Sequence, residues 1–343
     1  MYPALTVVEA LKIDRQNLLW VGGQGGMEEA LVKRENISYL SIPAAGVHGV
    51  DLKKLLGNLL KLVTGYSASR RILKDFKPDV LFFTGGYVAI PMALAGNRLP
   101  SVLYVPDIEP GMALKFLARF ARRIALTTES SRKFFSSKEN ATVTGYPIRQ
   151  GLTKWTKIEG RSYFNISGDH PVILFMGGSS GARSINNAVL EILPDLVKKY
   201  QVIHITGHLD WDIIQPKSVN YGSNYHVFPY LHEVGAALAA ADLVVSRAGA
   251  STLGEYPLFE LPAILVPYPY AWRYQKVNAE FLVAHNAAVM LSDETLNTTL
   301  LKAIDQLMLD KNKLSCMRKA MAALAQPEAA MQIAALINEV VEV

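Results

Sequence analysis

Turns rich in glycine and hydroxyl residues hold the groups best suited to chemistry in this sequence. The clearest follows the apolar run 172–176 and leads into a helical pattern; its residues are Gly177, Gly178, Ser179, Ser180, Gly181, Ala182 and Arg183. A strand, such a turn and a helix bring unpaired backbone N–H groups and the positive end of a helix dipole to one point, which suits a phosphate. The glycines let a ligand approach the backbone, and the two serine hydroxyls add donors. The alternative for one such motif is an ordinary tight turn.

This turn lacks the features of a dinucleotide fingerprint. Its spacing differs from G-x-G-x-x-G, and the next apolar run ends in Thr206 and Gly207 where a carboxylate would hold a ribose. The sequence therefore argues against NAD.

A second turn follows the apolar run 242–246. Residues 249–252 are small or carry hydroxyls and would again open a helix N-terminus to an anion, and Glu255 lies about one helical turn further on. A carboxylate there could accept two hydrogen bonds from a ribose diol. The alternative is a glutamate on a solvated helix face. The turn consists of Gly249, Ala250, Ser251, Thr252, Leu253, Gly254 and Glu255.

Two further loops follow apolar runs. Residues 265–278 are rich in proline and aromatic rings, and Gln275 and Asn278 can both donate to and accept from the hydroxyls of a sugar. A packed surface loop is the alternative. In the first half, residues 80–84 end in the glycine turn Gly85, Gly86 and Tyr87, and residues 22–26 form one more.

The elements that must position these turns follow the pattern of a parallel sheet covered by helices on both faces. Runs of β-branched and aromatic residues alternate with amphipathic helical patterns, so the fold class is α/β. Open sheets of this kind bind ligands at the carboxyl ends of their strands, so the turns point toward a cleft between two domains. The expected strands are residues 17–21, 80–84, 101–105, 124–127, 172–176, 201–206, 242–246 and 263–267, and the clearest helices are 52–74, 186–199 and 279–285.

Length and composition allow two domains. The chain has 343 residues, half of them hydrophobic, and a domain takes ~100 to 200 residues. Residues 151–168 have the composition of a polar linker, so the expected domains are 1–150 and 151–343, with the last helix a candidate to pack back on the first domain. The chain opens in a helical pattern at residues 3–11, whereas a doubly wound domain starts with its central strand. We interpret this as a start codon placed too late, with an unusual fold as the alternative.

Charge and cysteine content restrict the partners. Residues 1–150 contain 20 Lys or Arg against 12 Asp or Glu, a surplus of +8, whereas residues 151–343 contain 15 against 18, or −3. A negatively charged partner would therefore meet the first half. The single cysteine, Cys316, excludes an internal disulfide and every multi-cysteine metal site, which fits a reducing cytoplasm. No apolar run reaches the ~18 residues of a membrane helix.

Taken in order, the motifs resemble those of the MurG-type glycosyltransferases of glycosyltransferase family 28. The resemblance extends over nearly the whole chain, from residues 2–5 through 85–88 and 178–183 to 247–255 and 275–278. It implies a GT-B architecture, in which two Rossmann-like domains face across a cleft, and the transfer of N-acetylglucosamine to an undecaprenyl-linked muramoyl-pentapeptide in peptidoglycan synthesis. Similar enzymes invert the anomeric carbon, hold the donor mainly in the C-terminal domain and require no cofactor or metal.

The resemblance also assigns the donor contacts. Glu255 would hold the ribose, Leu231 matches the position whose backbone reads uracil, and Arg149 matches an interdomain phosphate contact. The donor would be UDP-GlcNAc or a similar UDP-sugar. The remaining donor-binding residues are Gly178, Ser179, Ser180 and Gly181 for the diphosphate, Ala250, Ser251, Thr252, Leu253 and Gly254 for the nucleotide, and Tyr274 and Gln275 for the sugar.

The acceptor side departs from the family. The family's first strand and its Gly-Gly-Thr-Gly-Gly-His loop, which holds a candidate base, would precede Met1, and the family's His-Glu-Gln-Asn segment is here Tyr104 to Asp107. Asp107 is a candidate replacement base, and a loop or cap role is its alternative. The expected acceptor-side residues are Gly85, Gly86, Tyr87, Tyr104 and Asp107.

Two segments predict contact with an anionic membrane. Residues 51–74 interleave leucines with Lys53, Lys54, Lys61, Arg70, Arg71 and Lys74, and residues 115–123 repeat the mixture with Phe116, Leu117 and Phe120. The alternative is a helix that faces the core and leaves a solvated basic side.

These observations lead to one principal hypothesis, a peripheral enzyme at the cytoplasmic face of the cell membrane that transfers a sugar from a UDP-sugar to a lipid-linked acceptor. Two alternatives stay open, a related transferase for another lipid acceptor and a homologue that binds the UDP-sugar without catalysis. Nucleic acid is not an expected partner, because the basic clusters lie on apolar helices with little aromatic stacking surface.

Overall fold

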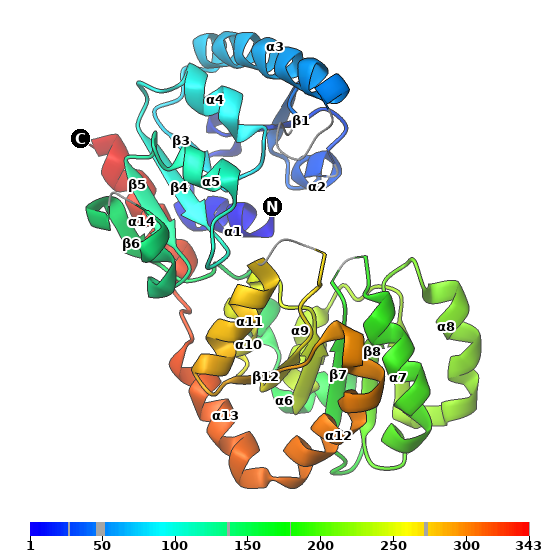
Figure 1. Ribbon diagram of the computed structural model, residues 1–343. Helices are drawn as coiled ribbons and strands as arrows, with labels where there is room; N and C mark the ends of the chain where they lie inside the picture. The colour runs from blue at the N-terminus through cyan, green and yellow to red at the C-terminus, as the bar shows by residue number, and fades with distance from the viewer. Residues whose placement is uncertain (27, 46–51, 136–137, 179, 271–273, 343) are drawn as a thin grey trace. The chain divides into compact units, whose positions relative to one another are not determined.

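The structure is a computed structural model that describes residues 1–26, 28–45, 52–135, 138–178, 180–270 and 274–342 (Figure 1). The chain forms two compact units. Unit 1 consists of Met1–Arg149 together with Pro327–Val343, and unit 2 consists of Gln150–Gln326. Each unit is built around parallel strands, which confirms the α/β class.

Unit 1 contains two separate parallel sheets. Strands β1 (Leu19–Gly23) and β2 (Ser38–Ile42) form a pair, and β3 (Leu81–Phe83), β4 (Ser101–Val105), β5 (Arg123–Leu126) and β6 (Ala141–Val143) follow one another in order in the second sheet. The helices of this unit are α1 (Tyr2–Leu11), α2 (Glu28–Arg34), α3 (Leu52–Phe76), α4 (Ala89–Ala95), α5 (Met112–Leu117) and α14 (Ala329–Glu342).

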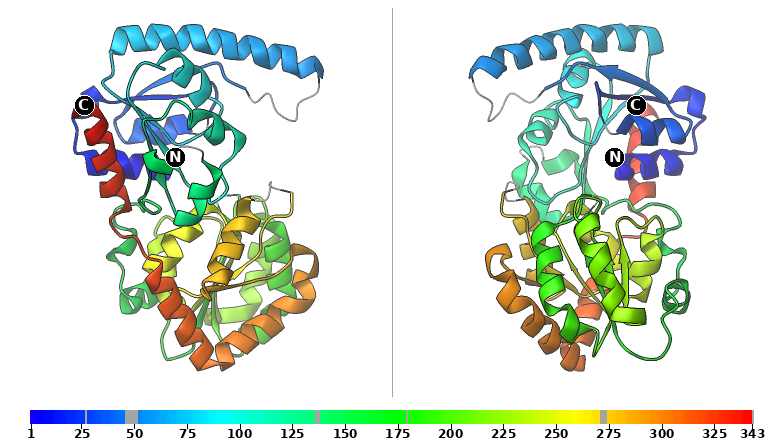
Figure 2. Two further views of the ribbon diagram at one scale, coloured as in Figure 1. Left: turned by 60° about the vertical axis from the view of Figure 1, so that its left-hand side comes forward. Right: turned by 90° about the vertical axis from the view of Figure 1, so that its right-hand side faces the viewer.

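The first and last helices of the chain pack together in unit 1 (Figure 2). Apolar residues recur along α14 at helical spacing, so one stripe of the helix faces inward. Ile333 and Val7 of α1 are fully buried in a core that they share with Val102 of β4. The C-terminal segment is therefore part of the N-terminal unit.

Unit 2 is a doubly wound sheet. The strand order is β12 (Ala288–Met290), β11 (Ala263–Leu265), β10 (Leu243–Ser246), β7 (Val172–Met176), β8 (Gln201–Ile205) and β9 (Tyr225–Phe228), and every pair is parallel. The chain adds strands on one side of β7 and then on the other, so the order reverses between β7 and β10. The helices are α6 (Lys157–Tyr163), α7 (Arg183–Leu196), α8 (Trp211–Ser218), α9 (Val234–Ala240), α10 (Glu255–Leu258), α11 (Tyr274–Ala284), α12 (Leu296–Leu309) and α13 (Lys311–Ala323).

Short 3₁₀ turns connect several of these elements. They are η1 (Arg15–Asn17), η2 (Glu129–Phe134), η3 (Lys138–Asn140), η4 (Leu152–Lys154), η5 (Val219–Asn224), η6 (Ala250–Leu253) and η7 (Asp293–Thr295).

The core of unit 2 holds in place the strand ends from which the two glycine turns start. Helices α7 and α12 pack on one face of the sheet, where residues such as Ile185 and Leu300 meet Phe175 and Val245 of the two central strands. The two central strands β7 and β10 are buried almost throughout and are mostly apolar, so they could be predicted from the sequence. This core holds the carboxyl ends of β7 and β10 in a rigid frame.

The polar segment 151–168 is not a simple linker, so that prediction is wrong. It contains helix α6, which begins with a capping box in which the Thr156 side chain accepts from the Glu159 amide and the Glu159 carboxylate accepts from the Thr156 amide. Gly160 of α6 lies against the backbone of α9 at Ala236. The helix is polar because only one side of it is covered.

Candidate functional site

The two glycine turns of unit 2 lie on either side of the point where the strand order reverses. Strands β7 and β10 are neighbours, and Ser246 at the end of β10 is paired with Met176 at the end of β7. The turns that follow therefore start at the same level of the sheet. Doubly wound sheets bind ligands outside the carboxyl ends of the strands at this position.

The turn after β7 has a backbone that only glycine can adopt. Gly178 and Gly181 have φ angles of +84° and +82°, and the Gly181 amide donates to the Gly178 carbonyl at 3.0 Å. A Cβ atom on Gly181 would lie 2.1 Å from the carbonyl oxygen of Thr206. The turn is therefore pressed against the segment that follows β8. Ser180 is exposed, and Ser179 lies outside the described residues.

Helix α7 starts directly behind this turn without a side-chain cap. Its N-cap residue is Ala182, in an extended conformation, and no side chain of the described residues bonds the first amides there. Four leading N–H groups of a helix lack partners within the helix, so an external acceptor can bind them. The uncapped N-terminus of α7 is compatible with an anion site, which stays a prediction.

A polar network that is buried except for the exposed Arg183 side chain lies behind the same turn. The Arg183 Nε atom donates to Asp210 Oδ1 at 2.9 Å, and Asn186 Nδ2 donates to Asp210 Oδ2 and to the Thr206 carbonyl, both at 2.9 Å. Asn186 Oδ1 then faces His204 Nε2 at 2.9 Å, which assigns the proton to that nitrogen. His204 Nδ1 therefore accepts from the Tyr225 hydroxyl at 2.8 Å.

Burial lowers the pKa of His204 to about 3, which keeps its ring neutral. Burial also raises the pKa of the Tyr225 hydroxyl, so this group remains a donor. The network therefore ties the start of α7 to the carboxyl end of β8 and to the first residue of β9. It does so through the neutral side chains of Asn186, His204 and Tyr225 and the ion pair of Arg183 with Asp210. The sequence analysis missed this network, because its members lie on separate strands and helices.

The turn after β10 is compact. Gly249 precedes η6, and the Thr252 amide and hydroxyl both donate to the Gly249 carbonyl, at 3.0 and 2.7 Å. The Thr252 hydroxyl is therefore used within the turn. Glu255, half-buried, is the first residue of α10. The other predicted residues of this turn are the half-buried Ala250 and Ser251 and the buried Leu253 and Gly254.

The sugar-side residues differ in what they can offer. Gln275 Oε1 accepts from the Tyr268 amide at 2.9 Å, so its amide nitrogen is the group suited to a sugar hydroxyl. Asn278 is fully buried and donates to the Ala248 carbonyl at 3.2 Å, so it supports the second turn. Tyr274 starts α11 and is half-buried, and Leu231 is a buried residue of the loop after β9.

Unit 1 brings several acceptor-side candidates to one sheet edge. Strands β3 and β4 are parallel neighbours, so the turn at Gly85 and Gly86 and the loop with Asp107 follow strands that end on the same side. Tyr87 is exposed and Asp107 is half-buried. Tyr104 differs from them: its ring is fully buried and its hydroxyl lies 2.8 Å from Thr127 Oγ1. Its side chain therefore belongs to the core.

Two other predicted features have local partners. The guanidinium of Arg149 stacks over the Tyr2 ring at 4.3 Å within unit 1. In the glycine turn after β1, the Glu28 carboxylate accepts from the Gly23 amide at 3.2 Å. That turn therefore already holds an anionic group of the chain itself, unlike the turn after β7.

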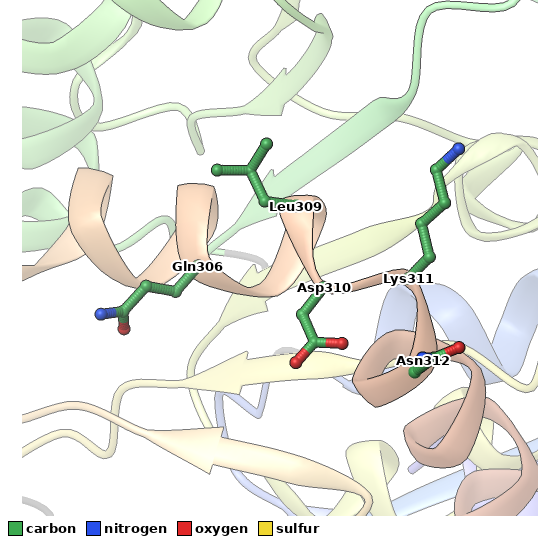
Figure 3. A pocket seen from close by; sticks show the side chains of 5 residues that line it. All are labelled: Gln306, Leu309, Asp310, Lys311 and Asn312. Carbon is green, nitrogen blue, oxygen red and sulfur yellow. The ribbon is translucent and has the colours of Figure 1, made fainter.

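A surface hollow lies away from these residues, at the joint of α12 and α13 (Figure 3). Helix α12 begins just after η7, beside the carboxyl end of β12, and runs 14 residues from there, roughly 20 Å at the α-helical rise. The hollow is at its far end, where Asp310 caps α13. It is lined by Gln306, Leu309, Asp310, Lys311 and Asn312, and no residue of the two glycine turns is among them. Within the described part of the chain, no group of three His, Cys, Asp or Glu residues is placed to hold a metal.

Comparison with known proteins agrees with this arrangement. The N-terminal domain of glycosyltransferase family 28 matches residues 1–126, and the C-terminal domain of the same family matches residues 172–333. The second match contains both glycine turns of unit 2.

Curated relatives match over almost their full length. A UDP-N-acetylglucosamine–N-acetylmuramyl-(pentapeptide) pyrophosphoryl-undecaprenol N-acetylglucosamine transferase of Roseiflexus sp. is 37% identical over 99% of this chain and 92% of its own. The Bacillus subtilis protein of the same name is 31% identical over 99% of this chain and 96% of its own.

Solved structures share the fold. MurG of Acinetobacter baumannii superposes with a TM-score of 0.75 at 25% identity, covering 98% of this chain and 95% of that one. A UDP-GlcNAc 2-epimerase from Neisseria meningitidis reaches a TM-score of 0.68 at 15% identity, over 99% of this chain and 96% of that one, which is a likeness of fold alone. The expected GT-B class and the resemblance to the MurG-type enzymes are thereby confirmed. The chain belongs to glycosyltransferase family 28.

Proposed function

We propose that the protein transfers N-acetylglucosamine from UDP-GlcNAc to a lipid-linked muramoyl-pentapeptide, with inversion at the anomeric carbon. The observation that carries this proposal is the pair of turns at the strand-order reversal of unit 2, in a chain whose curated relatives bear the name of this activity. A nucleoside diphosphate needs an anion site and a carboxylate for its ribose. The N-terminus of α7 and Glu255 provide these two groups.

The donor would bind residue by residue along this edge of the sheet. The diphosphate takes the amides at Gly178 to Gly181 and the start of α7, and the ribose diol takes the Glu255 carboxylate. The uracil meets the backbone at Leu231, and the sugar meets Gln275 through its amide nitrogen. We place Tyr274 beside the sugar and Arg149 on a phosphate oxygen.

In the reaction, an acceptor hydroxyl oxygen attacks C1 of the sugar while the bond from C1 to the UDP oxygen breaks. The hydroxyl proton passes to a base, for which Asp107 is the candidate, and the electron pair of the broken bond leaves with UDP. Preorganised amides at the helix N-terminus stabilise the charge that develops on the diphosphate. We infer that these amides serve without a metal ion, so that excess EDTA would leave the rate unchanged.

The acceptor would bind at the carboxyl edge of β3 and β4. Gly85, Gly86 and Tyr87 offer an open turn and an exposed ring beside Asp107. Tyr104 would not contact the acceptor and would instead hold the end of β4 in place, because its hydroxyl is hydrogen-bonded to Thr127.

The decisive experiment measures UDP release from UDP-GlcNAc with and without the undecaprenyl-diphospho-muramoyl-pentapeptide. Release that depends on this lipid supports the proposal. Release only with another lipid, such as a diacylglycerol, would identify a related transferase. UDP binding without release for any acceptor would identify a non-catalytic binder.

The donor assignment is tested at Glu255. Glu255→Ala removes the charged acceptor of two ribose hydrogen bonds and should weaken UDP binding about tenfold or more in calorimetry. Glu280→Ala is a matched control, since Glu280 is an exposed carboxylate on α11. Equal affinities for the two variants would contradict the ribose contact.

We further propose that the enzyme works at the cytoplasmic face of the membrane and attaches to it through α3. No helix among the residues that the structure describes is long and apolar enough to cross a membrane. One side of α3 packs on α4 of its own unit, where Ser69 is fully buried. The exposed sides present the apolar residues Leu59, Leu60, Val63 and Tyr66 together with the cations Lys61, Arg70, Arg71 and Lys74.

These exposed residues fit an anionic lipid surface, and they do not face the core. Lys53 and Lys54 lie where side chains are outside the described set. The second predicted segment contributes less, because Leu117 is fully buried and Phe120 packs on the core of unit 1. Co-sedimentation with vesicles rich in anionic phospholipid should fall when Leu60 and Val63 are both changed to Ser. Unchanged binding by that variant would contradict the role of α3.

A further inference from the structure

A buried ion pair connects the two donor turns to the far edge of the unit 2 sheet. Asp293 belongs to η7, between β12 and α12, and lies in neither turn. Its Oδ1 atom accepts from Ser184 Oγ at 2.6 Å and from Arg247 Nη1 at 2.5 Å. Arg247 Nη2 in turn donates to Ser184 Oγ at 2.8 Å. The three side chains form a closed triangle in which Ser184 both donates and accepts.

The triangle joins the end of the first turn to the start of the second. Ser184 lies in the first turn of α7, directly after the glycine turn that follows β7. Arg247 is the first residue after β10 and precedes the turn that begins at Gly249. Arg247 Nη1 also donates to the Val266 carbonyl at 3.1 Å, at the end of β11. One guanidinium thereby links the segments that follow β7, β10, β11 and β12.

Burial makes these contacts strong and their loss costly. The side chains of Arg247 and Asp293 are only 11% and 18% exposed. Charges attract more strongly where water is excluded, and the Arg247 guanidinium would keep its positive charge without a counter-ion if Asp293 were neutral. We therefore expect neutralisation to move Arg247 or to draw in an anion, and either change alters the spacing of the two turns.

We propose that Asp293 is a positioning residue for the donor nucleotide. Through Ser184 and Arg247 it sets the distance between the anion site at α7 and the ribose site at Glu255, so a nucleoside diphosphate can span both. This inference rests on the proposed function, because it concerns how the same site holds UDP. The contact between Asp293 and Ser184 could not be predicted from the sequence, because the two residues are 109 positions apart along the chain.

The test compares UDP affinity, donor KM and thermal stability in the full-length protein. Asp293→Asn keeps the shape but removes the charge, and Ser184→Ala removes only one hydroxyl, so at least one variant should fold normally. Glu294→Gln is the matched control, because Glu294 is an exposed carboxylate next to Asp293 on the same turn.

We expect Asp293→Asn to raise the Kd for UDP and the KM for UDP-GlcNAc by about tenfold, with the acceptor KM unchanged. Ser184→Ala should give a smaller increase of the same kind and add little in the Asp293→Asn background, because both break one triangle. A purely structural role would lower the melting temperature and leave the affinity of the folded protein intact. That result, or equal UDP affinities for Asp293→Asn and Glu294→Gln, would overturn the inference. A wild-type protein that does not bind UDP would instead refute the proposed function and this inference with it.

Discussion

His204 is a buried base that makes stability depend on pH. Its pKa falls to about 3 in the folded protein, whereas an exposed histidine has a pKa near 6.5. Below pH 6.5, His204 is therefore protonated in the unfolded chain but stays neutral in the folded chain. The free energy of unfolding consequently falls as the pH drops toward 3. Between pH 7 and pH 5 this residue should cost about 2 kcal/mol, measured by urea unfolding at the two values.

His204→Gln provides the comparison for this prediction. Glutamine can keep part of the bonding to Asn186 and Tyr225 but does not titrate, so the variant should be less stable at pH 7 and lose less stability on acidification. His226, which is half-buried and also has a lowered pKa, contributes equally to both proteins. Parallel pH profiles would show that His204 is not the responsible group.

Residue types predicted the site better than they predicted each side chain's task. Glycine and hydroxyl residues after apolar runs predicted both turns of the proposed donor site, because those residues are needed locally for the backbone. The partners of Asn278 and Tyr104, which are Ala248 and Thr127, could not be predicted because they are distant in sequence. The triangle of Ser184, Arg247 and Asp293 was missed for the same reason.

At the scale of elements, the contact between Gly181 and the segment after β8 determines whether the anion site forms. Gly181→Ala would place a Cβ atom against the Thr206 carbonyl in a backbone region that disfavours side chains. We expect a loss of roughly 3 kcal/mol in the free energy of unfolding, together with the loss of UDP binding. Chemical unfolding and calorimetric titration of the same preparation measure both effects.

Gly168→Ala is the control that distinguishes the effect of backbone strain from the effect of the close contact between Gly181 and Thr206. Gly168 has a φ of +74°, but a Cβ atom there would meet nothing within 4 Å. This variant should lose only about 1 kcal/mol and bind UDP normally. If the two variants behaved alike, the close approach of Gly181 to Thr206 would not be what shapes the turn.

Element prediction succeeded where burial is complete. Most of the predicted strands are apolar runs in the sequence. Each of the eight predicted ranges overlaps an observed strand. Strands β2, β6, β9 and β12 were not predicted, because at least half of the residues in each are only partly buried or exposed, which leaves a weak apolar run. Helix α6 was overlooked because its polar composition reflects one exposed side.

At the scale of the whole molecule, unit 1 is made from two distant parts of the chain, which follows from the apolar stripe of α14. Arg123 of β5 also pairs with Glu339 of α14. An apolar stripe predicts that the helix packs against a hydrophobic surface, but the spacing of its residues does not predict which unit supplies that surface. From the sequence, the last helix was therefore only a candidate to pack on the first domain. The core that α14 shares with α1 and β4 shows where it lies.

This arrangement predicts that a change in the last helix destabilises unit 1 without affecting the donor site. Ile333→Ala removes a fully buried side chain and should cost about 3 kcal/mol, whereas Met331→Ala, at a position 58% exposed, should stay within about 0.5 kcal/mol. Scanning calorimetry with and without UDP distinguishes the units, because UDP raises only the transition of the unit that binds it. Ile333→Ala should lower the transition that UDP leaves unchanged and keep the wild-type Kd for UDP. A fall in UDP affinity for this variant alone would mean that the donor site depends on unit 1 for its shape, and the two units would then have to be treated as one cooperative body.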